Sequence, residues 1–301
     1  MTTRKGKLTA KLGLNKLLQS LRSGKTAAVV GGALSEEIGI PQFEAILNGV
    51  WSGTPKNVDP FGNGNGRESV LGWFGWRMHL IRKKSYGPCF QVIRELKTVL
   101  SLSIVASQAV DGQLRLGGMH DVLELYGNIF EGRCSRCGIA VPSLSPEMMC
   151  PGHHPICDAC GGYVFPDVSM FGWNQKTETQ NQVKAILAKA DTVILIGADL
   201  SLAPFNDRDS LDACRYNVLE VLPKELRLSD ASTVLRATPK ALSDEFEKQY
   251  GQTFPAPNSS SLRSNLEYLA GLVRTLEELG APPMGTGANS DFQPKANTGH
   301  R

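Results

Sequence analysis

Residues 26–35 read Thr-Ala-Ala-Val-Val-Gly-Gly-Ala-Leu-Ser, and this stretch decides the fold. The run from Thr26 to Val30 is apolar and short, which is typical of a buried strand. Gly31 and Gly32 follow at once, and the chain then enters residues that favour a helix. A strand, a glycine-rich turn and a helix form the first unit of a nucleotide-binding α/β sheet.

The rest of the chain alternates strands with helices. Apolar runs predict buried strands at 102–106, 192–197 and 217–222. Helical patterns cover 8–23, 69–84, 89–100, 177–190 and 261–278. Strands that are separated by helices run in the same direction, so the sequence predicts an α/β protein with a parallel sheet.

Four cysteines have the spacing of a zinc ribbon, Cys134-x2-Cys137-x19-Cys157-x2-Cys160. Two close pairs about 20 residues apart can fold back as two knuckles and present four sulfurs to one tetrahedral ion. The module lies between units of the sheet, so it is predicted to be an insert. Zinc is the expected metal.

The other cysteines and two histidines are weaker candidates. Cys150, His153 and His154 lie between the two pairs, and Cys150 could replace one member of a pair, but the paired spacing favours the four cysteines. Cys89 and Cys214 lie among apolar residues and are predicted to be buried fillers.

The composition indicates a folded protein. The chain has 301 residues, of which 41% are apolar and 20% charged, enough for one large domain or one domain with an insert. It has no apolar run long enough to cross a bilayer and no signal-peptide core, so we expect no membrane association. Seven cysteines, four of them assigned to a metal, fit a reducing intracellular compartment better than a disulfide framework. Cytoplasm, nucleus and mitochondrion are not distinguished.

The N-terminal segment is basic. Residues 1–34 contain basic side chains and no acid, which resembles a mitochondrial transit peptide, although a solvated helix face has the same pattern. The cluster Arg4, Lys5, Lys7 and Lys11 lacks interleaved aromatic residues, so nucleic-acid binding is not expected except through this segment.

Several motifs occur together in a fixed order. They are the glycine turn, Gly39-Ile40-Pro41-Gln42-Phe43-Glu44, Gln108 to Gly112, Val122 to Gly127, the two cysteine pairs, Pro166 to Gly172, and Gly197 to Leu200. This order resembles the sirtuin family of NAD-dependent protein deacylases over about residues 15–275. The resemblance implies a Rossmann-type domain and a smaller domain made of a zinc ribbon and a helical module. It also implies that NAD and an acyl-lysine peptide bind in the cleft between them.

The resemblance also suggests boundaries. The predicted parts are a basic segment with the first helix at 1–24, a sirtuin-like domain at 25–280, and a disordered tail at 281–301. Within the domain, the Rossmann-like parts are about 25–44, 100–125 and 165–280. The inserts are the helical module at 45–99 and the zinc ribbon at 128–164.

Several cofactor positions of the family are kept and others are replaced. Those that match are Gly31, Gly32, Ser35, Phe43, Gln108, Asp111 and Gly197. Those that depart are Ala33, Gln42, Glu44, Ala109, Ala198 and Asp199. Glu44 stands where the family has an arginine that meets the cofactor, and an anion there repels a diphosphate. The resemblance implies NAD, but these replacements predict that NAD is poorly held.

The catalytic positions are altered as well. Tyr126 occupies the position of the family's general-base histidine, and a phenol titrates near 10, far above the pH at which a base must work. Ala109 replaces an asparagine that positions water and ribose, and its side chain has no hydrogen-bonding group. No catalytic residue of the family is therefore expected to be intact.

The sequence predicts a sirtuin-like, zinc-binding protein that is inactive as a deacylase and acts as a binding, regulatory or structural subunit with a protein partner. The alternative is an active NAD-consuming enzyme, either an atypical deacylase or a mono-ADP-ribosyltransferase, because Phe43, Gln108 and Asp111 leave part of the cleft.

Overall fold

The computed structural model describes most of the chain. The described residues are 18–19, 21, 25–41, 65–84, 87–100, 102, 105–150, 152–169, 176–199, 202, 217–221, 226–230, 233–235, 239–258 and 261–279. The basic segment, the tail from 281 and Cys214 therefore lie outside them. Of the predicted first helix, Leu18, Gln19 and Leu21 are described, and they are helical.

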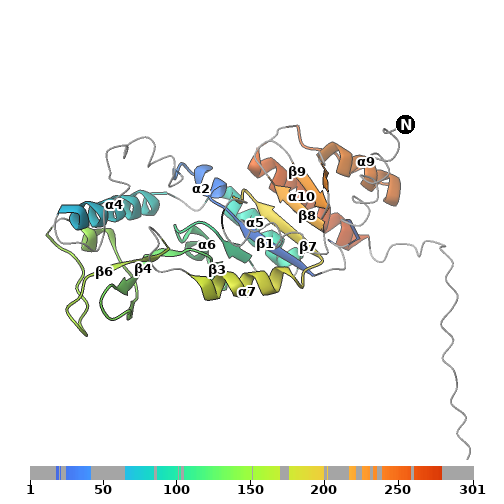
Figure 1. Ribbon diagram of the computed structural model, residues 1–301. Coiled ribbons are helices and arrows are strands. Elements are labelled where there is room, and N and C mark those ends of the chain that lie inside the picture. Colours follow the sequence, from blue (N-terminus) through green and yellow to red (C-terminus); the bar gives the residue numbers. More distant parts are fainter. Residues whose placement is uncertain are drawn as a thin grey trace, which may run out of the picture.

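A seven-stranded sheet with the order β10-β9-β8-β7-β1-β2-β3 forms the centre of the larger part (Figure 1). Its strands are β1 (Thr26–Val30), β2 (Val105–Ser107), β3 (Leu123–Glu124), β7 (Thr192–Ile196), β8 (Asn217–Val221), β9 (Leu226–Asp230) and β10 (Thr233–Leu235). Five neighbouring strands of this sheet pair in parallel, in the order β8-β7-β1-β2-β3. This confirms the predicted α/β class with a parallel sheet.

The far edge of this sheet differs from the prediction. β9 and β10 pair antiparallel, and neither strand was expected from the sequence. Only residues 222–225 join β8 to β9, and only 231–232 join β9 to β10. A parallel return needs a crossover of a dozen or more residues, so these short connections require antiparallel pairing.

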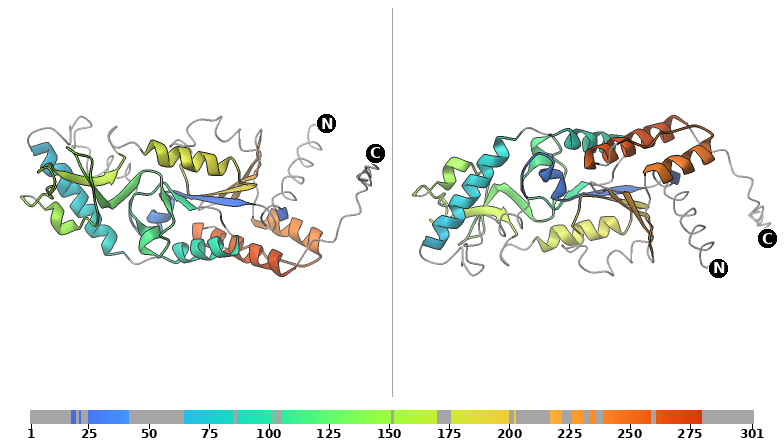
Figure 2. Two further views of the ribbon diagram at one scale, coloured as in Figure 1. Left: turned by 90° about the horizontal axis from the view of Figure 1, so that it is seen from below. Right: turned by 90° about the horizontal axis from the view of Figure 1, so that it is seen from above.

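Helices cover both faces of the sheet, as Figure 2 shows edge-on. They are α2 (Ala33–Glu36), α5 (Pro88–Val99), α6 (Gln113–Leu116), α7 (Thr177–Leu187), α9 (Pro239–Tyr250) and α10 (Leu262–Glu278). In β1, Ala28 and Val30 join the core cluster that contains α5 and α10, whereas Ala27 and Val29 join the cluster that contains α7. This alternation is the period of two that a buried strand imposes on its side chains.

A second sheet, with the order β5-β4-β6, carries the cysteines. It contains β4 (Gly127–Cys134), β5 (Ala140–Val141) and β6 (Val164–Val168), and we call residues 127–168 the cysteine module. Helix α4 (Asn65–Arg82) and the 3-10 turn η1 (Pro146–Met149) pack beside it (Figure 1). Among the described residues, no helix combines the length and the apolar character needed to cross a membrane.

Candidate functional site

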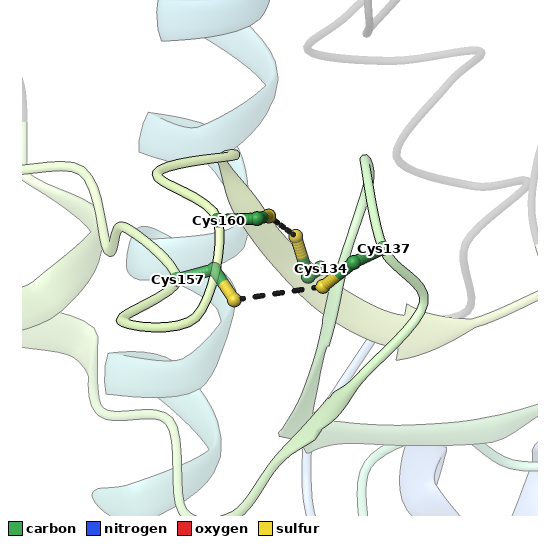
Figure 3. Close-up of side chains that lie close together, drawn as sticks. All are labelled: Cys134, Cys137, Cys157 and Cys160. Atoms are coloured by element: carbon green, nitrogen blue, oxygen red, sulfur yellow. Dashed lines mark hydrogen bonds between the residues drawn. The ribbon is translucent and has the colours of Figure 1, made fainter.

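The four cysteines of the zinc-ribbon pattern meet in space (Figure 3). Their sulfur atoms all lie within 4.8 Å of one another. The Sγ atoms of Cys134 and Cys160 are 3.4 Å apart, and those of Cys137 and Cys157 are 3.7 Å apart. Four thiolates about 2.3 Å from a tetrahedral zinc ion lie about 3.8 Å from each other. The group therefore fits one metal ion of zinc's size and preferred ligands.

A glycine follows each cysteine pair and closes the knuckle through a backbone hydrogen bond. The amide of Gly138 donates to the carbonyl of Cys134 (3.0 Å), and the amide of Gly161 donates to the carbonyl of Cys157 (2.8 Å). Both glycines have left-handed backbones, with φ of +72° and +68°. Glycine adopts this conformation without a steric penalty, so the repeated Cys-x2-Cys-Gly is a further sequence signal for the site.

The rival ligands lie apart from this group. The Cys150 thiol is exposed and lies 3.9 Å from the carbonyl of Pro146, and His154 lies 3.5 Å from Glu68. In the part of the chain that the structure describes, the four cysteines are the only cluster of this kind. Cys89 is buried, and burial, followed by the charge of Glu37, raises the pKa of its thiol to about 11.

The second candidate site lies at the carboxyl ends of β1, β2 and β7. The glycine turn after β1 is in direct contact with the turn after β7. A Cβ added to Gly31 would lie 2.1 Å from the carbonyl oxygen of Gly197, and one added to Gly197 would lie 2.6 Å from the Cβ of Ala33. The two glycines thus allow two turns far apart in sequence to touch.

Retained polar side chains link each of these turns to the segment that follows β2. The side-chain amide of Gln108 donates to the carbonyl of Asp199 (2.9 Å) and accepts from its N–H (2.8 Å). The hydroxyl of Ser35 donates to the carboxylate of Asp111, which also accepts from the N–H of Gln113 (3.0 Å). The structure therefore brings Gly31, Gly32, Ser35, Gln108, Asp111 and Gly197 to one edge of the sheet.

Tyr126 lies in the turn between β3 and β4, at the same edge. Its ring is half-buried and packs on the apolar cluster under α7. Burial, followed by the negative charge of Asp199, raises the pKa of the phenol to about 12. Tyr126 therefore keeps its proton at neutral pH. The backbone of Ala109 bonds to the hydroxyl of Ser107, which accepts from its N–H (3.1 Å) and donates to its carbonyl (3.1 Å).

Gln42, Phe43 and Glu44 lie outside the described residues, as do 170–172. Sequence reasoning missed Arg77 of α4, a buried guanidinium that donates to the carbonyl of Pro41 (3.0 Å). Burial lowers its pKa, and the nearby charge of Asp111 acts in the opposite direction. Its position in an aromatic-rich helix gave no signal of this role.

Glu124, two residues before Tyr126, is a further buried acid that the motifs did not single out. Its side chain is 8% exposed, lies 3.2 Å from Arg115 and accepts from Asn128 (2.8 Å). Burial raises its pKa to about 7, against the opposing charge of Arg115. Between pH 4.5 and 7 the folded protein keeps a proton that the unfolded chain has released, so this group's contribution to stability is lost as the pH rises through about 7.

Glu124→Gln is therefore expected to raise the stability at pH 8, by on the order of 2 kcal/mol, and to have little effect at pH 4.5. Denaturant unfolding at several pH values measures this difference. Glu131→Gln removes the other, half-exposed carboxylate that pairs with Arg115. Its charge is a lesser cause of the raised pKa of Glu124, so this control should show the same pH dependence only to a much smaller degree. A uniform loss of stability in Glu124→Gln at both pH values would contradict the assignment.

The sequence is similar to those of known proteins. The profile of the Sir2 family matches residues 31–204. An NAD-dependent protein deacylase of Mycobacterium tuberculosis is 29% identical over 220 residues, covering 70% of this chain and 90% of that protein. One of Aeropyrum pernix is 31% identical over 186 residues, covering 59% of this chain and 71% of that protein.

A solved structure agrees with the sequence relatives. The structure of a Sir2 homologue in complex with NAD superposes with a TM-score of 0.64 at 22% identity, covering 88% of this chain and 94% of that one. It establishes the shared fold. The resemblance inferred from the motifs is confirmed, and the chain belongs to the Sir2 family, the sirtuins.

Proposed function

We propose that this protein is a zinc-binding sirtuin without deacylase activity, which acts by binding a protein partner as a regulatory or structural subunit. Tyr126 carries the proposal. A general base must accept a proton near the working pH, and a phenol with a pKa of about 12 holds its own proton instead.

The surrounding groups support the same conclusion. The side chain of Ala109 has nothing to position water or a ribose. Asp199 adds a carboxylate at the edge where a dinucleotide would place its phosphates, and like charges repel. Loss of a general base alone lowers a rate by about 10² to 10⁴, and here the cofactor positions are altered too. The cysteine module keeps all four ligand residues although the catalytic positions have changed, which suggests that the chain retains the fold for another use.

The metal has a structural role in this proposal. Cys134, Cys137, Cys157 and Cys160 would hold zinc as thiolates, and the ion would supply a fixed, charge-neutralising cross-link between knuckles that have little core of their own. Reduced thiols are needed for this, which favours a reducing intracellular compartment.

The alternative is an active NAD-consuming enzyme. The relatives named above are NAD-dependent protein deacylases, and one solved Sir2 homologue contains NAD. Gln108, Asp111 and Ser35 are kept at the sheet edge, which leaves part of a cofactor site.

We expect the purified protein to release no nicotinamide above a blank when it is incubated with NAD and acyl-lysine peptides. Tyr126→His should also remain inactive, because Ala109 and the altered cofactor positions are untouched. The deacylase of Mycobacterium tuberculosis serves as the active control. Calorimetry with NAD and ADP-ribose separates the two hypotheses, since clear binding together with turnover in the unmodified protein would establish the alternative.

A further inference from the structure

Helix α4 and the cysteine module share one apolar core. The buried face of α4 contributes Leu71, Phe74, Met78 and Ile81, among others, to a cluster that also contains the metal-site residues Cys134 and Cys157. The helix also lies directly on η1. A Cβ added to Gly75 would lie 2.9 Å from the Cβ of Met149. A change in the module therefore reaches α4 through packed atoms.

Polar contacts fix the first turn of α4 to the second knuckle. The guanidinium of Arg67 lies over the ring of Tyr163, 4.1 Å from its centroid. The neighbouring Glu68 lies 3.5 Å from Nε2 of His154, whose side chain is 10% exposed. Tyr163 pairs with Ile156 across the knuckle that holds Cys157 and Cys160. The contacts of Arg67 and Glu68 are thus made with the knuckle that the metal would close, the one that holds Cys157 and Cys160.

Further along its length, the same helix contacts residues 40 and 41, which follow the glycine turn of the large sheet. Arg77 donates to the carbonyl of Pro41 (3.0 Å) and lies in the field of Asp111, which binds the hydroxyl of Ser35. Ile40 belongs to the apolar cluster of α4, and its N–H donates to the carbonyl of Ser35 (3.0 Å). The turn at 31–36 is therefore held partly from α4.

We propose that the metal site controls the order of the glycine turn through helix α4, with Arg67 and Glu68 as the link at one end and Arg77 as the link at the other. Metal at the four cysteines holds the knuckles, the knuckles hold the first turn of α4, and α4 holds Pro41 and the turn at Ser35. This coupling does not depend on whether the protein has deacylase activity.

The physical reason is that the knuckles are stabilised mainly by the metal. Each is closed by a few backbone hydrogen bonds, and Cys134 and Cys157 are themselves part of the cluster against which α4 packs. Removing the ion leaves the thiols without the cross-link that fixes their positions, because metal binding and folding are linked in such sites. The loss spreads to the elements that contact the knuckles before it reaches the rest of the large sheet.

Hydrogen exchange of the full chain with zinc, and after removal of zinc by a chelator, tests the coupling. On zinc loss, amides of α4 and of residues 31–36 should exchange faster by at least about tenfold, whereas α7 and α10 should keep their protection.

Two variants break the chain of contacts at different points. In Arg67→Met/Glu68→Gln the protein should still bind one zinc, but α4 and residues 31–36 should exchange faster even with zinc present. In Arg77→Met, zinc loss should still speed the exchange of α4 amides. The exchange of residues 31–36 should no longer depend on zinc. Arg94→Met on the exposed face of α5 is the matched control and should behave as the unmodified protein.

Two outcomes would overturn the proposal. In one, zinc loss exposes only the amides of the cysteine module and leaves α4 and residues 31–36 as protected as before. In the other, α7 and α10 lose protection together with α4, which would mean that zinc supports global stability rather than a path to the glycine turn. Neither result depends on a measurement of turnover, so failure here is distinct from failure of the proposed function.

Discussion

We expect Cys134→Ser to abolish metal binding, with the zinc content falling from about one ion per chain to near zero, and to unfold the cysteine module. The expected effect is large because structural zinc contributes about 10–16 kcal/mol of apparent binding free energy in small zinc domains, and a serine hydroxyl does not replace a thiolate. The Cys134 side chain is also buried in the cluster shared with α4, so its loss reaches beyond the knuckle.

Metal analysis and circular dichroism of the full chain measure this result. Cys150→Ser is the matched control, since that exposed thiol lies outside the four-sulfur group and its replacement should leave zinc content and unfolding temperature unchanged. If Cys134→Ser kept a full equivalent of zinc while Cys150→Ser lost it, the ligand set derived from the geometry would be wrong.

Gly31→Ala is expected to destabilise the protein by about 3 kcal/mol or more, although it adds only one methyl group. The new Cβ would lie 2.1 Å from the carbonyl oxygen of Gly197 and 2.4 Å from the Cα of Ala198. Both are backbone atoms, so no side chain can rotate away, and the turns after β1 and β7 would have to separate.

Chemical denaturation compares this variant with Gly72→Ala. Gly72 lies inside α4 with nothing within 4 Å of an added Cβ, so alanine there should stabilise the protein by about 0.5–1 kcal/mol, through helix propensity and reduced freedom of the unfolded chain. If the free energy of unfolding falls in Gly31→Ala and rises in Gly72→Ala, the atoms around each glycine set the effect of the added methyl group. Equal small effects at both positions would contradict the observed packing.

The parts of the fold that could be predicted have local causes. Thr26–Val30 and Thr192–Ile196 are apolar runs of five residues. Such runs are too short for a buried helix, so a strand could be predicted at each. The cysteine pairs carry their geometry in their spacing. By contrast, β9 has only two apolar residues among its five and β10 is three residues long, so neither forms an apolar run. Their pairing follows from connection lengths that are known only once β8 is placed.

The candidate sites divide in the same way. The cluster of four cysteines could be predicted because two Cys-x2-Cys pairs at that spacing are typical of a zinc site. The pairing of Gln108 with the backbone of Asp199 joins positions 91 residues apart, and nothing in either stretch indicates it. Arg77 was missed for the same reason, since its contacts with Pro41 and Asp111 exist only after α4 has packed against the module.

The strand order has a consequence for how such a protein can change its role. From β1 the chain proceeds to β2 on one side and later returns to β7 on the other, so β1 lies at a topological switch point, where connections diverge to opposite faces of the sheet. In open α/β sheets this divergence itself creates the ligand crevice. Connectivity produces such a crevice and point substitutions do not alter connectivity, so a chain with this strand order can change its side chains at this position without changing the fold that surrounds them.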